Sequence, residues 1–259
     1  MTEKDLLYRV ERHVGTITIH RAATRNAITL EAVTLFHAAL DQALADVDVR
    51  AVCITGAGDK AFCSGADLGS GMQDDAAGRR DRFDSYARLI SRLAEFPKPT
   101  VARVNGHCLA GGTGFMLACD IVIAKASAQF GTPEVNVGLF PMMIGALIFR
   151  NVPRKKAMEM ILLGRRLTAD QALSMGLVTR VVPDADLDAE VDQVLAELAA
   201  KSPIGLKLGK TAFAAAEQMP LTEAVRYLGS QLAVVAATQD AREGIRAFVE
   251  KRAPQFKGE

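Results

Sequence analysis

The chain has 259 residues and a net charge of +1, with 49% hydrophobic and 24% charged residues. This length is enough for one large core or for a core with an appendage, and the charge lacks the basic excess of a nucleic-acid binder. The polar start, Met1 to Asp5, lacks the apolar core of a signal peptide, and no apolar run is long enough to span a bilayer. We therefore expect a cytoplasmic protein with no membrane and no nucleic-acid partner.

The first fifth of the chain predicts a hairpin, a helix and a further strand. Runs of β-prone residues at 7–11 and 16–20, joined through Gly15, predict a hairpin at a sheet edge. Thr29 is a predicted N-cap, and apolar side chains repeat at helical spacing from Val33 to Val47. The apolar run at 51–55 is the next expected strand. Strand, helix and strand in this order indicate a parallel crossover.

Small and polar residues at 69–80 predict a mobile loop, which beside a site can serve as a lid. Apolar residues from Phe83 to Leu93 then predict an amphipathic helix that Pro97 and Pro99 end. Further strands are expected at 100–104, 120–124 and 128–130.

Beyond Pro141 the pattern becomes mostly helical. Helices are expected at 142–149, 154–163, 169–175 and 187–200, a short strand at 179–182, and three more helices from Ile204 onward. An apolar stripe from Leu221 to Val235 is too long for this segment to bury on itself, so it should pack on the core or on a neighbouring subunit. We therefore expect a core at 1–200 and a helical region at 201–259.

The glycine-rich stretch at 105–114 is the first candidate site. Gly111 and Gly112 allow a sharp turn into an apolar segment, Phe115 to Ala118, that is typical of the first turns of a helix. Amides at a helix start have no partner within the helix, so the Gly111 amide can donate to an oxygen that gains negative charge. The alternative is that the glycines only mark a turn or a close helix contact. A second run of small residues, at 61–68, favours the first interpretation.

The cysteines and histidines show no metal-binding or nucleophile spacing. Cys53, Cys63, Cys108 and Cys119 form no C-x-x-C pair, so we expect buried, reduced thiols and no metal site. His107 stands beside the glycine segment, where it could touch a ligand, but a single histidine of this kind is more often structural.

Four segments carry a specific combination of signatures, which continues almost to the end of the chain. They are Ala61-Phe-Cys-Ser-Gly-Ala-Asp67-Leu68, Asn105-Gly-His-Cys-Leu-Ala-Gly-Gly112, Cys119-Asp120 and Phe130-Gly-Thr-Pro-Glu134-Val-Asn-Val-Gly138. Together they resemble the successive signatures of the enoyl-CoA hydratase/isomerase family, the crotonase superfamily.

The resemblance implies an α/β fold with a spiral core of repeated β-β-α units at 1–200, a C-terminal helical region used in trimerisation, and acyl-CoA thioesters as substrates. It implies that the backbone amides of Ala66 and Gly111 hold the thioester oxygen as it becomes an enolate. Coenzyme A is part of the substrate, so no separate cofactor is expected, and the expected assembly is a homotrimer or a dimer of trimers. The other positions that match family contacts to CoA are Arg25, Ala61, Ser64, Asp67, Leu68, Phe248 and Lys251.

The sequence departs from the family pattern at Gly114, where hydratases of this family usually carry the first of two glutamates. Only Glu134 remains. Hydration needs a base for water and an acid for the α-carbon, whereas moving a double bond needs one group that removes a proton and returns it elsewhere. We therefore expect Glu134 to be the general acid/base of an enoyl-CoA isomerisation. Its pKa should be raised by an apolar pocket made by Phe115, Leu139, Phe140 and Met142.

Other functions stay open at this point. One is hydration of 2-enoyl-CoA, as in fatty-acid β-oxidation, or a hydrolase or lyase variant of the same enolate chemistry. Another, from a different class, is a non-catalytic acyl-CoA-binding protein that kept the fold. The single residues have alternatives of their own, in which Glu134 is a loop carboxylate that caps a nearby backbone and Arg25 and Lys251 are solvated surface charges.

Overall fold

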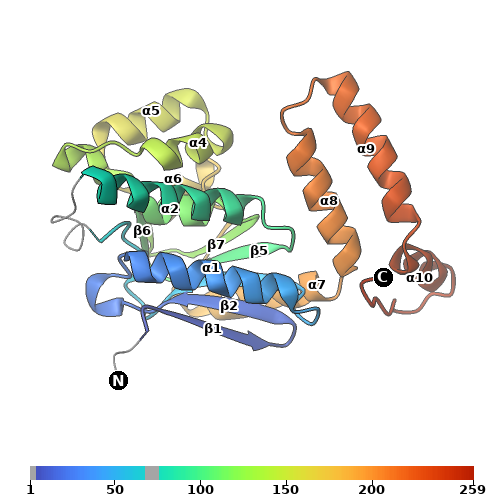
Figure 1. The fold of residues 1–259 in the computed structure, drawn as a ribbon. Coiled ribbons are helices and arrows are strands. Elements are labelled where there is room, and N and C mark those ends of the chain that lie inside the picture. Colours follow the sequence, from blue (N-terminus) through green and yellow to red (C-terminus); the bar gives the residue numbers. More distant parts are fainter. Residues whose placement is uncertain (1–3, 68–75) are drawn as a thin grey trace.

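The computed structural model describes residues 4–67 and 76–259 and has an α/β architecture with two sheets (Figure 1). The large sheet contains, in spatial order, β1 (Leu6–Glu11), β2 (Val14–Ile19), β3 (Ala51–Gly56), β5 (Thr100–Val104), β7 (Ile121–Lys125) and β10 (Arg180–Val182). The small sheet contains β4 (Ala61–Cys63), β6 (His107–Leu109), β8 (Gln129–Gly131) and β9 (Leu167–Thr168). Neighbouring strands are parallel except for β1 with β2 and β8 with β9.

From β3 to β8, successive strands alternate between the two sheets. β3, β5 and β7 belong to the large sheet, and the strand after each of them, β4, β6 or β8, belongs to the small one. The helices α2 (Ala76–Ala94), α3 (Gly111–Leu117) and α4 (Met142–Asn151) follow these three pairs in turn. This confirms the repeated β-β-α unit that the resemblance implied. Because β4, β6 and β8 run parallel, their carboxyl ends meet at one edge of the small sheet.

The first long helix, α1 (Leu30–Ala45), begins where the sequence predicted. The Thr29 hydroxyl accepts a hydrogen bond from the Ala32 amide at 3.0 Å, as an N-cap does. The prediction was wrong at the other end, because the chain leaves the helix at Asp46 and Val47 is 88% exposed. The remaining helices are α5 (Arg154–Leu163), α6 (Ala169–Ser174), α7 (Leu187–Ala199), α8 (Pro203–Ala216), α9 (Leu221–Ala236) and α10 (Gln239–Val249), with 3-10 turns at Ala22–Thr24, Pro133–Val137 and Asp184–Asp186.

Two further expectations are corrected by the structure. The hairpin turns at Arg12 and His13, which both have positive φ, whereas Gly15 lies inside β2. Of the loop expected at 69–80, residues 76–80 instead begin α2, and 69–75 lie outside the described residues. The short strands β4, β6 and β9 were not among the expected strands, whereas β8 and β10, which are equally short, were expected.

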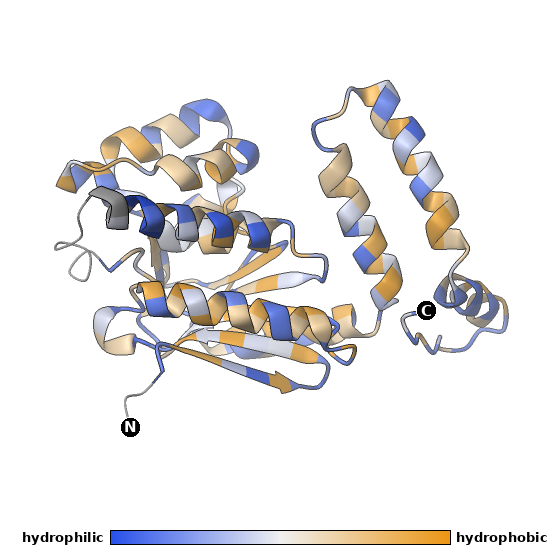
Figure 2. Cartoon of the chain, in the orientation of Figure 1, coloured by the Kyte–Doolittle hydropathy of each residue, from blue (hydrophilic) through white to orange (hydrophobic). Residues whose placement is uncertain are grey.

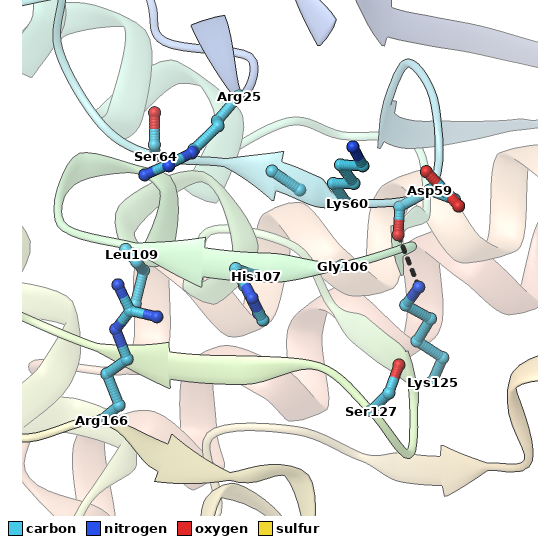
Figure 3. A pocket seen from close by; sticks show the side chains of 11 residues that line it. Arg25, Asp59, Lys60, Ser64, Gly106, His107, Leu109, Lys125, Ser127 and Arg166 are labelled. Atoms are coloured by element: carbon cyan, nitrogen blue, oxygen red, sulfur yellow. Dashed lines mark hydrogen bonds between the residues drawn. The ribbon is translucent and has the colours of Figure 1, made fainter. Parts of the chain in front are cut away.

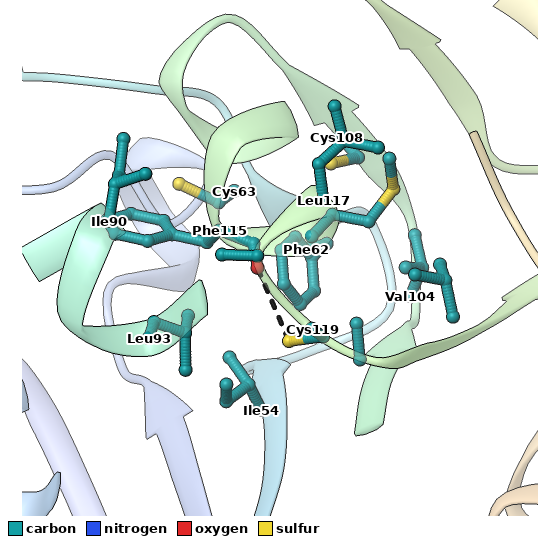
Figure 4. Close-up of a cluster of buried hydrophobic side chains, with 14 of the residues drawn as sticks. Ile54, Phe62, Cys63, Ile90, Leu93, Val104, Cys108, Phe115, Leu117 and Cys119 are labelled. Atoms are coloured by element: carbon teal, nitrogen blue, oxygen red, sulfur yellow. Dashed lines mark hydrogen bonds between the residues drawn. The ribbon is translucent and has the colours of Figure 1, made fainter. Parts of the chain in front are cut away.

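Hydrophobic side chains fill the space on both faces of the large sheet. The larger cluster contains Phe62 of β4, Ile90 of α2 and Phe115 of α3 (Figure 4). A second cluster lies between the large sheet and α7, where it includes Val191 and Leu195. All four cysteines are buried and free, as expected.

The three C-terminal helices extend away from the body (Figure 1) and carry apolar surface (Figure 2). Leu221 and Leu232 on α9 are 80% and 67% exposed, and Phe248 on α10 is 84% exposed. Lys210 on α8 connects this region to the body by donating to the Lys98 carbonyl at 3.0 Å. The apolar stripe of α9 is thus left uncovered within one chain. No helix in the described ranges combines the length and apolarity needed to cross a membrane.

Two buried asparagines fix the turn that carries the chain from β3 in the large sheet to β4 in the small one. Asn26 donates to the carbonyls of Ala57 and Ala61, at 3.0 and 2.7 Å. Asn105 donates to the carbonyls of Gly56 and Gly58, at 2.8 and 2.6 Å, and accepts from the Gly56 amide. Their side chains therefore satisfy backbone groups that the turn would otherwise bury without partners.

We expect Asn105→Ala to lower the free energy of unfolding by about 3 kcal/mol, because it leaves several buried backbone groups unpaired. Denaturant unfolding measures this difference. The matched control is Asn151→Ala, which removes an exposed asparagine at the end of α4 and should change stability by no more than about 0.5 kcal/mol. Equal stability of the two variants would contradict the role given to Asn105.

Candidate active site

The segment after β4 runs beside Ile28 of the same chain, and its Ala66 amide points away from Ile28. Ile28 pairs with Ala66 in a parallel bridge, in which the Ile28 amide donates to Gly65 and the Asp67 amide donates to Ile28, at 2.8 and 2.9 Å. Successive peptide groups of an extended chain point in opposite directions, so the amide of Ala66 itself points away from Ile28.

The start of α3 lies directly beside this segment. Gly111 is the first residue of α3, so its amide has no partner within the helix. A Cβ added to Gly65, whose φ is +95°, would lie 3.0 Å from the Gly111 nitrogen and 2.7 Å from Ala110 Cβ. The structure thus brings together the two segments whose amides the sequence had singled out.

Glu134 enters the same region from the end of β8. The strands β6 and β8 are neighbours, and the Ala110 amide donates to the Gly131 carbonyl at 2.9 Å. The Glu134 atom Oε2 is buried and has no hydrogen-bond partner among the described residues. Burial raises the pKa of Glu134, and a hydrogen bond from its own backbone amide opposes that rise.

The surroundings of Glu134 differ from the expected apolar pocket. Phe115 is fully buried, but Leu139, Phe140 and Met142 are 50%, 47% and 75% exposed within one chain. The direction of the pKa shift was predicted correctly, and of the four side chains expected to cause it only Phe115 is buried within one chain.

Apolar packing closes the helix position at Gly114. A Cβ added there would lie 2.4 Å from Ile144 Cγ2 and 3.0 Å from Ile90 Cδ1. Gly114 is itself buried in α3. A longer side chain at this position therefore has no room unless α2 or α4 moves.

A basic pocket of about 500 Å³ lies over the small sheet (Figure 3). The His107 side chain lies among the residues that line it, and Lys125 donates to the Asp59 carbonyl at its rim. Burial, followed by the charges of Arg166, Lys125 and Arg25, lowers the pKa of His107 and favours its neutral form. Positive charge gathered in a concave site attracts phosphate groups. The lining residues that carry charge are Arg25, Asp59, Lys60, Lys125 and Arg166.

The predicted CoA contacts are only partly brought together. Arg25, Ala61 and Ser64 line the basic pocket. The Asp67 carboxylate accepts a hydrogen bond from Arg21 at 2.9 Å. Leu68 lies outside the described residues.

Two further predicted contacts belong to another part of the chain. Phe248 lies on α10 and Lys251 follows it, and both are exposed. In Figure 1, α10 stands at the opposite side of the molecule from β6, so one chain does not bring these residues to its own pocket.

Sequence reasoning missed several residues of this region. Lys60, Lys125 and Arg166 lie far apart along the chain, and each is an ordinary surface charge in its local sequence. Tyr86 was assigned only to the apolar face of a helix, yet its hydroxyl donates to the Gly111 carbonyl at 2.6 Å. The available signal was a tyrosine at a position of the helix where the other residues are apolar. Because a buried tyrosine hydroxyl usually finds a polar partner, this position predicts a hydrogen bond.

The arrangement has a definite chemical capacity. Two adjacent amides without helix or bridge partners can stabilise an oxygen that gains negative charge. A carboxyl group with a raised pKa can accept a proton from a ligand and return it. The pocket of cations beside them suits a ligand that carries phosphate.

Comparison with known proteins gives one consistent family. Residues 9–259 match the family model described as enoyl-CoA hydratase/isomerase. The 2,3-dehydroadipyl-CoA hydratase of Escherichia coli is 34% identical over 256 residues, which cover 98% of this chain and 99% of that protein. A solved enoyl-CoA hydratase from Bacillus anthracis is similar with a TM-score of 0.94 at 32% identity, covering 98% of this chain and 100% of that one. An enoyl-CoA hydratase from Mycobacterium smegmatis matches with the same TM-score at 33% identity, covering 98% and 99% of the two chains.

We expect Glu134→Gln to stabilise the folded protein at neutral pH. The folded-state pKa of Glu134 lies above its unfolded value, so the parent protein loses stability as pH rises from the unfolded pKa of about 4.3 to the folded one. Glutamine does not titrate, and the stability advantage of the variant should grow across that window and stay constant above it. Urea unfolding at a series of pH values measures this, with the exposed Glu197→Gln as control. A pH-independent advantage would show that burial of the charge is not its cause.

Proposed function

The chain belongs to the enoyl-CoA hydratase/isomerase family, and from this premise we propose that it moves the double bond of enoyl-CoA thioesters. The observation that carries the preference for isomerisation is the packing at Gly114, where Ile144 and Ile90 occupy the space into which a second carboxylate would extend. Glu134, with its raised pKa, is then the acid/base group.

The proposed reaction uses one proton twice. The Glu134 carboxylate removes a proton from the α-carbon of a 3-enoyl thioester, and the electrons of that C–H bond move toward the thioester oxygen to give a dienolate. The amides of Ala66 and Gly111 stabilise the oxygen while it is negative. Protonated Glu134 then returns the proton to the γ-carbon, which leaves a 2-enoyl thioester. No water enters the reaction, so one carboxyl group is sufficient.

The basic pocket is proposed to hold the phosphates of the CoA moiety. Arg25, Lys60, Lys125 and Arg166 supply the positive charge there. The uncovered apolar surface of α9 and α10 supports assembly into a homotrimer or a dimer of trimers. We propose that in such an assembly Phe248 and Lys251 contact the pocket of a neighbouring copy, a placement that the separation of α10 from the pocket of its own chain allows.

Hydration of a 2-enoyl-CoA is the second candidate. It is favoured by the relatives, several of which are named hydratases. In that reaction Glu134 would have to position and deprotonate water without a second carboxylate from position 114. A non-catalytic acyl-CoA-binding protein is the third, and it would bind the thioester without exchanging the α-proton.

A paired assay with a 3-enoyl-CoA and with crotonyl-CoA, resolving 2-enoyl from 3-hydroxyacyl products, separates these functions. We expect only the 3-enoyl substrate to react, and Glu134→Gln to lower kcat by about 100-fold to 10,000-fold with little change in acyl-CoA binding. The activity of the parent should fall at acid pH, with a midpoint above the ordinary glutamate pKa, because only the ionised carboxylate removes a proton.

Efficient hydration of crotonyl-CoA would replace the isomerase proposal with the hydratase one. Tight binding without turnover or α-proton exchange would favour the binding protein. The variant Glu197→Gln is the control, since it makes the same change on the exposed face of α7 and should leave kcat unchanged.

Gly65→Ala tests the paired amides. The added Cβ would collide with Ala110 and press on the Gly111 nitrogen, so at least one amide should be displaced. Losing one such donor lowers kcat by about 100-fold to 1,000-fold. Gly209→Ala on α8, where an added Cβ meets nothing within 4 Å, should keep full activity. Full activity of Gly65→Ala would remove the amide pair from the mechanism.

A further inference from the structure

The backbone at Ala110 is strained. Its φ of 50° and ψ of −132° lie in a region that L-residues other than glycine rarely adopt. This conformation sets the plane of the peptide between Ala110 and Gly111, which contains the Ala110 carbonyl and the Gly111 amide. The carbonyl accepts from the Thr113 amide at 2.9 Å, inside the first turn of α3. A half-turn of this one peptide would leave the φ of Ala110 positive but move its ψ into the left-handed α region, which reduces the strain, and it would redirect the Gly111 amide.

Contacts on both sides of the peptide oppose that rotation. Before it, the Ala110 amide donates to the Gly131 carbonyl of β8 at 2.9 Å. After it, the Tyr86 hydroxyl of α2 donates to the Gly111 carbonyl at 2.6 Å. The same hydroxyl lies 2.3 Å from the position of a Cβ added to Gly111, so it also fills the space beside the Gly111 Cα.

Tyr86 is itself held firmly. Tyr86 is only 7% exposed, and its ring packs against the ring of Phe115 with the centroids 5.1 Å apart. Burial, with smaller contributions from Cys63, Cys108 and Glu134, raises its pKa well above the ordinary value. The hydroxyl therefore keeps its proton and remains a donor throughout the pH range in which Glu134 titrates.

We propose that Tyr86 is a positioning residue, whose hydrogen bond to the Gly111 carbonyl holds the strained Ala110–Gly111 peptide with the Gly111 amide available to the substrate. The catalytic consequence rests on the proposed function, in which that amide stabilises the dienolate oxygen. Tyr86 contributes no proton to the reaction, because its hydroxyl hydrogen is bound to the protein backbone.

Amide hydrogen exchange in the free protein, followed by NMR, tests the proposal without any substrate. Tyr86→Phe keeps the ring and removes the hydroxyl. Rotation of the Ala110–Gly111 peptide breaks the bond between the Thr113 amide and the Ala110 carbonyl, so we expect Thr113 to exchange roughly tenfold faster, as loss of a hydrogen bond of ordinary strength allows. The Ala110 amide belongs to the preceding peptide and should exchange at its original rate.

Ala110→Gly in the Tyr86→Phe background distinguishes positioning from general loosening. Glycine adopts positive φ readily, so removing the strain should return Thr113 exchange toward the parent rate. Two unrelated structural defects would instead add. Tyr8→Phe is the matched control, since its hydroxyl is buried without a partner among the described residues and its removal should leave Thr113 unchanged.

Kinetics supply the second readout. With a 3-enoyl-CoA, Tyr86→Phe should lower kcat roughly tenfold and leave KM within about twofold. The acid midpoint of the pH profile should stay the same. Adding Ala110→Gly should restore kcat toward the parent value. Unchanged Thr113 exchange, or no recovery with Ala110→Gly, would overturn the proposal, and a shifted pH profile would overturn it by making Tyr86 a proton-transfer group.

The exchange result stands apart from the proposed function. If Thr113 responds as expected but no enoyl-CoA reacts, the hold on the peptide is established and the proposed function fails. If Tyr86→Phe does not fold, the test uses Ala110→Gly alone, which should slow exchange of the Thr113 amide. Unchanged exchange in that variant would show that the Ala110–Gly111 peptide is not the strained group that Tyr86 holds.

Discussion

Backbone packed directly against backbone around residues 60–65 is the constraint on which the rest of the site depends. A Cβ on Gly106 would lie 2.3 Å from the Lys60 carbonyl carbon, and one on Gly112 would lie 2.3 Å from the Cys63 carbonyl oxygen. The residue before β4 therefore touches the residue before β6, and the last residue of β4 touches the start of α3, with no side chain between them. This close approach allows strands of three residues to form a sheet, and it places 65–66 beside 110–111. Side chains at these positions would separate the two amide-bearing segments.

The small sheet also separates two electrostatic environments. Alternate residues of a strand point to opposite faces, so Cys108 of β6 is buried in the core while His107 and Leu109 line the basic pocket. At the carboxyl edge of the sheet, burial raises the pKa of Glu134. On the pocket face, burial, followed by the charges of nearby cations, lowers the pKa of His107. An acyl-CoA thioester has matching parts, an uncharged acyl group and a phosphate-bearing nucleotide.

The strained backbone at Ala110 is held by contacts from several elements. The conformation costs about 1–3 kcal/mol in an isolated chain, so the surrounding structure has to maintain it. β8 contributes the Gly131 carbonyl, and α2 contributes the Tyr86 hydroxyl. The helix α2 follows β3 and β4 in sequence and precedes β5 and β6. Through the hydrogen bond from Tyr86 to Gly111 of α3 it nevertheless belongs to the candidate site.

The sequence by itself determined the local features of this protein. Thr29 and the apolar spacing after it predicted the start of α1, and the resemblance implied the β-β-α repeat. The glycines at 111–112 predicted a helix, but Phe115 to Ala118, expected as its first turns, form its end. These features depend on neighbours within a few residues or on quoted motifs. Only the tertiary structure decided that Ile144 fills the space at Gly114, that Tyr86 binds the Gly111 carbonyl, and that cations from separate segments share one pocket. Such contacts join residues far apart along the chain, and they depend on the shape of the packed core, which no local pattern encodes.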